Sequence, residues 1–149
     1  MAEEAVATEH AEPALRLRGV GRRFGGLHAV REVDLAVAPS ERRAVLGPNG
    51  AGKTTLFNVI AGDLPASSGR VELFGRDVTA MPARARAKLG LDREITLILI
   101  EHDMDVALRV AERVTMMHDG RVIVEGTPEE IRANELVHDL YLGTGFRND

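Results

Sequence analysis

The chain has 149 residues, a formal net charge of −4 at neutral pH and no cysteine. This length allows one domain with a buried core, and the lack of cysteine excludes disulfides, thiolate metal sites and cysteine catalysis. The acidic balance argues against a nucleic-acid partner. The longest strongly apolar run, residues 95–100, is too short to cross a bilayer. Because Met1 to Glu4 lack the basic start of a signal peptide, we expect a cytoplasmic location.

The N-terminal part predicts a tail followed by strands. Residues 1–13 are rich in alanine and glutamate without an apolar period, so we expect a flexible tail ahead of a single domain over 14–149. Alternation of apolar and polar residues predicts a half-exposed strand over 15–20 and a second strand over 29–37. A turn region over 21–26 separates them and contains one aromatic, Phe24.

A phosphate-binding loop is the strongest motif of the chain. A short apolar strand over 43–46 leads into it, and a helix is predicted from Thr54 to Ala61. The pattern G-x-x-x-x-G-K-[ST] is met by consecutive residues: Gly47, Pro48, Asn49, Gly50, Ala51, Gly52, Lys53 and Thr54, followed by Thr55. An ordinary glycine-rich turn before a helix is the alternative interpretation.

The motif has a direct physical basis. Glycines let successive backbone N–H groups point at an anion, and the N-terminus of the helix adds a partial positive charge. Lys53 can reach the outer phosphates of a nucleotide, and the Thr54 hydroxyl can bind Mg²⁺. The sequence therefore predicts a nucleotide phosphate site with Mg²⁺.

The second half alternates strands and helices. Turn residues fill 62–69, and a strand with a turn at 75–76 covers 71–78. A short basic helix over 82–88 should expose Arg84, Arg86 and Lys88 on a solvated face. Residues 95–100 are apolar throughout, as is typical of a strand covered on both faces in a parallel sheet.

The C-terminal part predicts a helix over 104–113 and two strands, 114–117 and 121–124, around a turn. Thr127 is placed to cap a helix with Pro128 in its first position, and helical pattern continues through Leu142 with a break near Asn134. Together the elements predict an α/β domain with a mostly parallel sheet and an added antiparallel β layer.

Five segments resemble the ATP-binding subunits of ABC transporters, a family of P-loop NTPases. They are residues 22–27, 47–55, 67–71, 97–104 and 119–130. Three stretches are most similar to the branched-chain amino-acid uptake branch of the family: Phe24 to Leu27, Ile100 to Met104, and residues 131–143.

The resemblance implies a role for each matching residue. Phe24 would stack on adenine, Lys53 would hold the β- and γ-phosphates, Thr54 would bind Mg²⁺, and Thr55 with the loop amides would add contacts. His102 would be the switch histidine at the γ-phosphate. The implied cofactors are ATP and Mg²⁺, and the implied partners are membrane permease subunits and a second ATP-binding subunit at the inner face of the cell membrane. Without the resemblance, Phe24 could equally be a core or turn residue and His102 a structural one.

The chain departs from the family between the phosphate loop and His102. The family has a glutamine loop, a helical subdomain, a Leu-Ser-Gly-Gly-Gln-like signature and a strand ending in Asp-Glu there. This chain has no glutamine and no Ser-Gly-Gly. We expect an internal deletion with its join near Leu91-Asp92, which would also leave residues 95–100 as an exposed, association-prone edge strand.

The deletion decides the expected activity. The deleted segment would have carried the carboxylate that polarises the attacking water. A general base of this kind typically contributes ~10²–10⁴-fold in rate. Glu101 is not expected to replace it, because the next residue occupies the switch-histidine position. Three interpretations remain open: an importer subunit with weakened hydrolysis, a non-hydrolysing nucleotide-binding module, and a non-functional deletion fragment. A small P-loop kinase or GTPase fits the closing segments less well.

Overall fold

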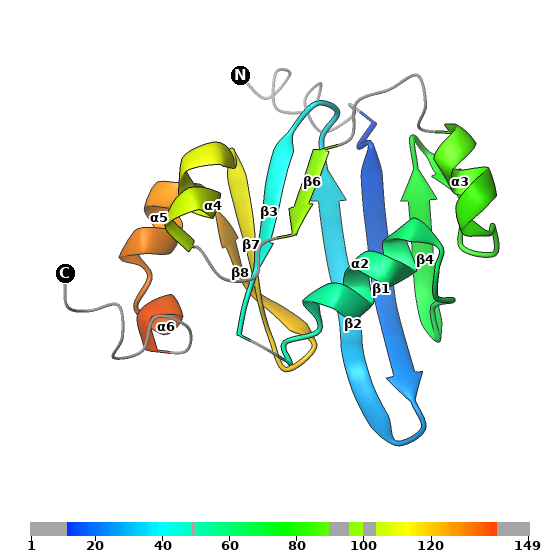
Figure 1. Ribbon diagram of the computed structural model, residues 1–149, viewed down its shortest axis with the longest axis horizontal. Coiled ribbons are helices and arrows are strands. Elements are labelled where there is room, and N and C mark those ends of the chain that lie inside the picture. The colour runs from blue at the N-terminus through cyan, green and yellow to red at the C-terminus, as the bar shows by residue number, and fades with distance from the viewer. Residues whose placement is uncertain (1–11, 49, 90–95, 100–103, 140–149) are drawn as a thin grey trace, which may run out of the picture.

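The computed structural model describes residues 12–48, 50–89, 96–99 and 104–139. Two four-stranded sheets and short helices make up the fold (Figure 1). In chain order the elements are β1 (Leu15–Phe24), β2 (Leu27–Val37), β3 (Arg42–Leu46), α2 (Lys53–Ala61), β4 (Ser68–Leu73), β5 (Arg76–Asp77), α3 (Ala83–Leu89), β6 (Thr96–Leu99), α4 (Met104–Val110), β7 (Arg113–His118), β8 (Arg121–Gly126), α5 (Pro128–Ala133) and α6 (Glu135–Val137). The predicted α/β class is confirmed.

The first sheet is antiparallel with the order β2-β1-β4-β5. β1 and β2 form a long hairpin whose register runs from the pair Leu15 and Val37 to the pair Phe24 and Leu27. The predicted turn over 21–26 is wrong, because β1 continues to Phe24 and the chain reverses only at the two following glycines. Register shifts interrupt this hairpin at three places, and such bulges erase the apolar–polar alternation on which the strand prediction depends.

The second sheet has the order β6-β3-β7-β8. β3 pairs in parallel with both β6 and β7, and β8 returns antiparallel to β7. The mostly parallel sheet is therefore confirmed. Within the described residues β6 has one strand neighbour, so it lies at the edge of the sheet, beside the strand that leads into the phosphate loop.

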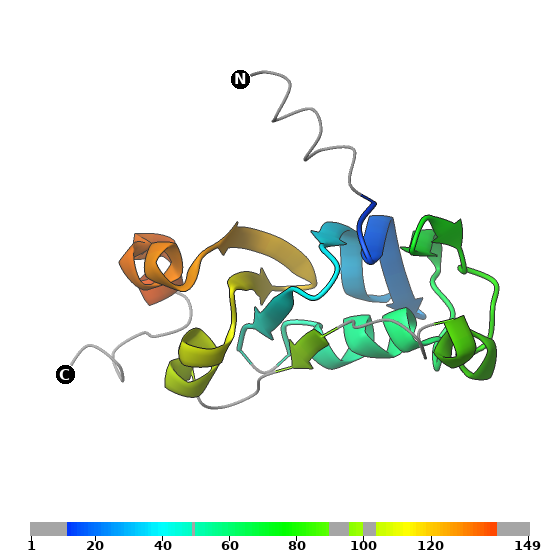
Figure 2. The same ribbon diagram turned by 90° about the horizontal axis from the view of Figure 1, so that it is seen from above.

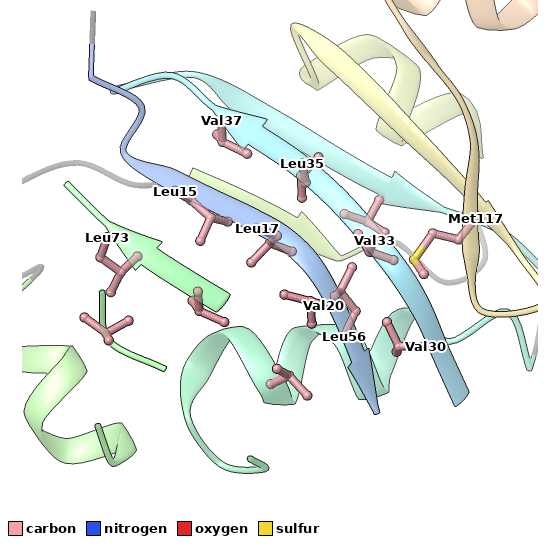
Figure 3. Packing of buried hydrophobic residues seen from close by; sticks show 14 of the residues in the cluster. Leu15, Leu17, Val20, Val30, Val33, Leu35, Val37, Leu56, Leu73 and Met117 are labelled. Carbon is pink, nitrogen blue, oxygen red and sulfur yellow. The ribbon is translucent and has the colours of Figure 1, made fainter. Parts of the chain in front are cut away.

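The main core lies between the antiparallel sheet, α2 and the second sheet (Figure 3). Alternate residues of β2 (Val33, Leu35 and Val37) point into it, as the two-residue period of a strand requires. α2 contributes Leu56 and Val59. Figure 2 shows α2 running along one face of the antiparallel sheet. The phosphate-loop helix is thus fixed to the molecule by its apolar side.

A second cluster covers the other face of β3. Ala44 and Leu46 belong to it, whereas Val45 between them belongs to the main core. Ala107 and Leu108 of α4 and Ile131 of α5 pack against it. β3 is therefore buried on both faces, as is usual for a strand within a parallel sheet.

α3 contradicts the prediction of a basic face fully open to solvent. Arg84 and Lys88 are exposed, but Arg86 is only 4% exposed. Its guanidinium donates to four backbone carbonyls, those of Val59, Ile60, Thr79 and Met81. The reason is that the last carbonyls of α2 have no partner within their own helix and accept from this arginine instead.

The C-terminal elements agree with most of the sequence prediction. Thr127 caps α5 in a capping box with Glu130, and Asn134 separates α5 from α6. The helix predicted over 104–113 is too long, since α4 ends at Val110 and β7 already begins at Arg113. No helix within the described ranges is long and apolar enough to cross a membrane.

Candidate functional site

The phosphate loop has the predicted strand–loop–helix setting, between the end of β3 at Leu46 and the start of α2 at Lys53. Gly47, Gly50 and Gly52 adopt φ angles of 152°, 85° and 102°, which side chains rarely allow. Gly52 is the N-cap of α2, and no side chain caps this end and no acidic residue lies in its first turn. The first amides of α2 are therefore not satisfied by a cap, as an anion site requires.

Close backbone contacts explain why two of these positions are glycine. A Cβ atom at Gly52 would lie 2.5 Å from the carbonyl oxygen of Ala29, and one at Gly47 would overlap the carbonyl oxygen of Met117. Ala29 belongs to β2 and Met117 to β7. The loop therefore fits against strands of both sheets with no room for side chains.

The side chain of Lys53, the first residue of α2, folds back onto the phosphate loop. Its side chain is 6% exposed, and Nζ donates to the carbonyl oxygen of Gly47 at 2.5 Å. A buried ammonium needs oxygen partners, and phosphate oxygens supply them as well as a carbonyl does. Lys53, the glycines and the uncapped end of α2 together fit a polyphosphate.

A cavity of about 460 Å³ joins the loop to the β1–β2 hairpin. From the loop and α2 it is lined by Gly50, Gly52, Lys53, Thr54 and Thr55, and from the hairpin by Phe24, Leu27, His28 and Ala29. Phe24 is 43% exposed, so its interpretation as a core residue is wrong. The structure brings Phe24 and the phosphate loop to one cavity, as the resemblance implied.

The turn between β7 and β8 closes another side of this cavity. Asp119 and Gly120 line it, and the Gly120 N–H donates to the Ala51 carbonyl oxygen at 2.9 Å. The Arg31 N–H of β2 in turn donates to the Gly120 carbonyl oxygen at 2.7 Å. The loop, the turn and β2 are thus held together by backbone hydrogen bonds.

The sequence did not identify five of the cavity residues, of which Leu27 is the first. His28 was interpreted as a surface or packing residue, yet it lines the cavity while remaining exposed. Ala29 carries no chemical signal. Asp119 and Gly120 stood in a predicted Asp-Gly turn, but only the fold brings that turn to the loop.

Thr54 is the candidate protein ligand for Mg²⁺. Its side chain is exposed and lines the cavity. No cluster of three or more His, Asp or Glu side chains that could hold a metal occurs among the described residues. Mg²⁺ keeps water and takes phosphate oxygens readily, so one hydroxyl together with a polyphosphate fits it. Asn49, His102, Glu101 and the expected join at Leu91-Asp92 lie outside the described residues.

Comparisons with known proteins give consistent results. The ABC transporter family model matches residues 30–143. A probable ABC transporter ATP-binding protein of Azorhizobium caulinodans is 42% identical over 108 residues, covering 68% of this chain and 38% of the relative. The ribose import ATP-binding protein RbsA of Shigella dysenteriae is 40% identical over 105 residues, covering 70% of this chain and 20% of the relative.

The high-affinity branched-chain amino acid transport ATP-binding protein LivG of Escherichia coli K12 is 36% identical over 95 residues, covering 64% of this chain and 37% of the relative. The chain therefore spans less than two fifths of the length of these relatives. A solved nucleotide-free ATP-binding cassette from an ABC transporter superposes with a TM-score of 0.74 at 18% identity, covering 87% of this chain and 98% of that structure. This superposition shows the fold.

Proposed function

The chain belongs to the ABC transporter family, and we propose that it is an ATP-binding subunit of an importer that binds Mg²⁺–ATP and hydrolyses it poorly. The observation that carries the proposal is the single cavity shared by Phe24 and the phosphate loop. An aromatic ring at one end and a phosphate cradle at the other match the two ends of a nucleotide.

Different residues of this cavity would contact the phosphates, the base and Mg²⁺ of the nucleotide. The first amides of α2 and the Lys53 ammonium face the phosphates, and Lys53 exchanges its bond to the Gly47 carbonyl for phosphate oxygens. The Phe24 ring stacks on the base, which typically contributes about 1–3 kcal/mol. The Thr54 hydroxyl and His102, by family resemblance, contact Mg²⁺ and the γ-phosphate. Mg²⁺ supplies charge neutralisation on the phosphates when bound.

Weak hydrolysis follows from the sequence between the loop and His102. Phosphoryl transfer to water needs a residue that orients the water, and the family's Asp-Glu pair and glutamine are absent from the sequence. Asp119 lines the cavity, but it lies on the tight turn between β7 and β8. A non-hydrolysing nucleotide-binding module is the second candidate, favoured by the same absence.

The proposal that the protein serves import rests on the names of its relatives. RbsA is described as a ribose importer component and LivG as a branched-chain amino-acid transport protein, and the two match this chain with 40% and 36% identity. The branched-chain branch is therefore not favoured over ribose import, and we propose uptake of a small nutrient without naming it. The proposed partners are permease subunits and a second ATP-binding subunit, at the cytoplasmic face of the membrane.

Isothermal titration with ATP, with and without Mg²⁺, tests binding. We expect saturable binding that Lys53→Ala abolishes and Lys88→Ala, the change at the other lysine of the chain, preserves. Failure of the wild-type protein to bind below millimolar ATP would refute both candidates and support a non-functional fragment. Phosphate release by the wild type at the level of Lys53→Ala would leave the non-hydrolysing module.

A further inference from the structure

The Phe24 ring has a cation on one of its faces. The guanidinium carbon of Arg22 lies 4.5 Å from the ring centroid, within the range of a cation–π contact. Both residues are among the last three residues of β1, before the hairpin reverses. Phe24 is 43% exposed, so its ring is accessible to a ligand.

Arg22 does not line the phosphate-loop cavity. It lines a second cavity of about 400 Å³, together with Arg23, Ser67 and Ser68, and Phe24 does not line that one. Conversely, Phe24 lines the phosphate-loop cavity and Arg22 does not. The guanidinium that contacts the ring therefore does not occupy the cavity that the ring shares with the phosphate loop.

Arg22 is itself anchored to the segment that follows the phosphate-loop helix. Its Nη1 donates to the carbonyl oxygen of Pro65 at 2.8 Å. Two backbone bonds reinforce the junction: the Ser67 N–H donates to the Gly21 carbonyl oxygen at 2.7 Å, and the Arg23 N–H donates to Ser67 Oγ at 2.9 Å. α2 thus begins at the phosphate loop, and the segment after it holds the arginine that covers Phe24.

One donor of Arg22, its Nε, is buried and has no hydrogen-bond partner among the described residues. Buried donors in this state are uncommon and unfavourable. The guanidinium nevertheless keeps this position, with its central carbon over the Phe24 ring and its Nη1 bonded to the Pro65 carbonyl oxygen.

We propose that Arg22 is a positioning residue for base recognition, which holds the Phe24 ring ready to stack on the base of a nucleoside triphosphate. The proposal rests on the proposed function, because it assigns the base to Phe24. A ring held before binding loses less rotamer freedom on binding. The cation also stabilises the electron-rich ring. Arg22 should therefore affect recognition of the base and leave recognition of the phosphates unchanged.

Titration of ATP and of inorganic triphosphate, both with Mg²⁺, separates the two contributions. We expect Arg22→Ala to weaken ATP binding about two- to fivefold, the equivalent of an exposed cation–π contact, and to leave triphosphate binding unchanged. Arg22→Lys, which keeps the charge without the planar guanidinium, should fall in between. Arg23→Ala is the matched control, because it removes an equal charge and keeps its backbone bond to Ser67.

A readout without nucleotide tests the contact itself. With 4-fluorophenylalanine at the four phenylalanines, the ¹⁹F signal of Phe24 is assigned by its loss in Phe24→Leu. Arg22→Ala should shift this signal and Arg23→Ala should not. Should Arg22→Ala fail to fold, Arg22→Lys gives both measurements.

The outcomes separate the two proposals. Loss of wild-type ATP binding would refute the proposed function, while the ¹⁹F shift would still report the Arg22–Phe24 contact. Equal weakening of ATP and triphosphate by Arg22→Ala, or no weakening of either, would overturn the positioning role.

Discussion

Nη1 of Arg86 donates to the carbonyl oxygen of Val59 at 2.8 Å, and equally to that of Ile60. These carbonyls belong to the last turn of α2, the helix whose first turn faces the phosphate loop. The same guanidinium donates to Met81 and Thr79. Burial lowers the pKa of Arg86 from its ordinary value, and arginine remains charged in proteins. A cation at this end of α2 also complements the helix dipole.

Loss of this cation should destabilise the protein. Arg86→Met removes a donor from four backbone carbonyls, of which that of Val59 keeps its bond from the Gly62 N–H, and we expect the free energy of unfolding to fall by about 2–4 kcal/mol. Urea denaturation followed by circular dichroism measures it. Arg84→Met, a change at an exposed position of the same helix, should have little effect, and equal effects of the two substitutions would refute the capping role of Arg86.

A methyl group at Gly52 should damage the phosphate loop. Its φ of 102° and the Ala29 carbonyl oxygen 2.5 Å from an added Cβ both oppose alanine there. We expect Gly52→Ala to lower stability by about 1–3 kcal/mol and to weaken nucleotide binding. Gly26→Ala, where no atom lies within 4 Å of the added Cβ, is the control, measured by thermal melting and ATP titration. Normal ATP affinity in Gly52→Ala would contradict the geometry.

Asp77 should give a small pH dependence. The Thr79 hydroxyl, and then the Thr79 backbone N–H, hold the pKa of Asp77 below its ordinary value. Since the folded pKa is depressed, its stabilising contribution is complete above the ordinary aspartate range and is lost as pH falls through the folded pKa. We expect the melting difference between the wild type and Asp77→Asn to shrink on acidification. A carboxyl ¹³C titration of Asp77 checks the direction, and an ordinary pKa there would contradict it.

The edge position of β6 predicts self-association. β6 pairs with β3 on one side and has no strand on the other within the described residues, and open edges template pairing with another chain. We expect the weight-average mass in analytical ultracentrifugation to rise with protein concentration. A single monomeric species over a hundredfold concentration range would argue against an open edge.

Local patterns predicted the parts of the fold that depend on neighbouring residues. The glycine and lysine spacing identified the loop, the short apolar run before the loop indicated the strand β3, and Thr127 with Pro128 marked the start of α5. Each of these signals lies within a few residues of the structure that it specifies, so no knowledge of distant contacts was needed.

Most of the wrong predictions at the candidate site and in α3 involve contacts between distant segments. Arg86 has the sequence surroundings of an exposed helical arginine, and only the packing of α3 against the end of α2 buries it. Ala29 and Gly120 join the candidate site because β2 and the β7–β8 turn meet the loop in space. Bulges in the β1–β2 hairpin hid the last residues of β1, which include Arg22 and Phe24.

The contacts of Gly47 with β7 and of Gly52 with β2 have a thermodynamic consequence. The phosphate cradle exists only when both sheets are assembled around it, so a ligand that fills it binds the native state and not the unfolded chain. Folding and nucleotide binding are then linked equilibria, and ligand at 100 times its dissociation constant should raise the unfolding free energy of the whole domain by about 2.7 kcal/mol. The rise in melting temperature on addition of nucleotide should therefore report nucleotide binding to this protein.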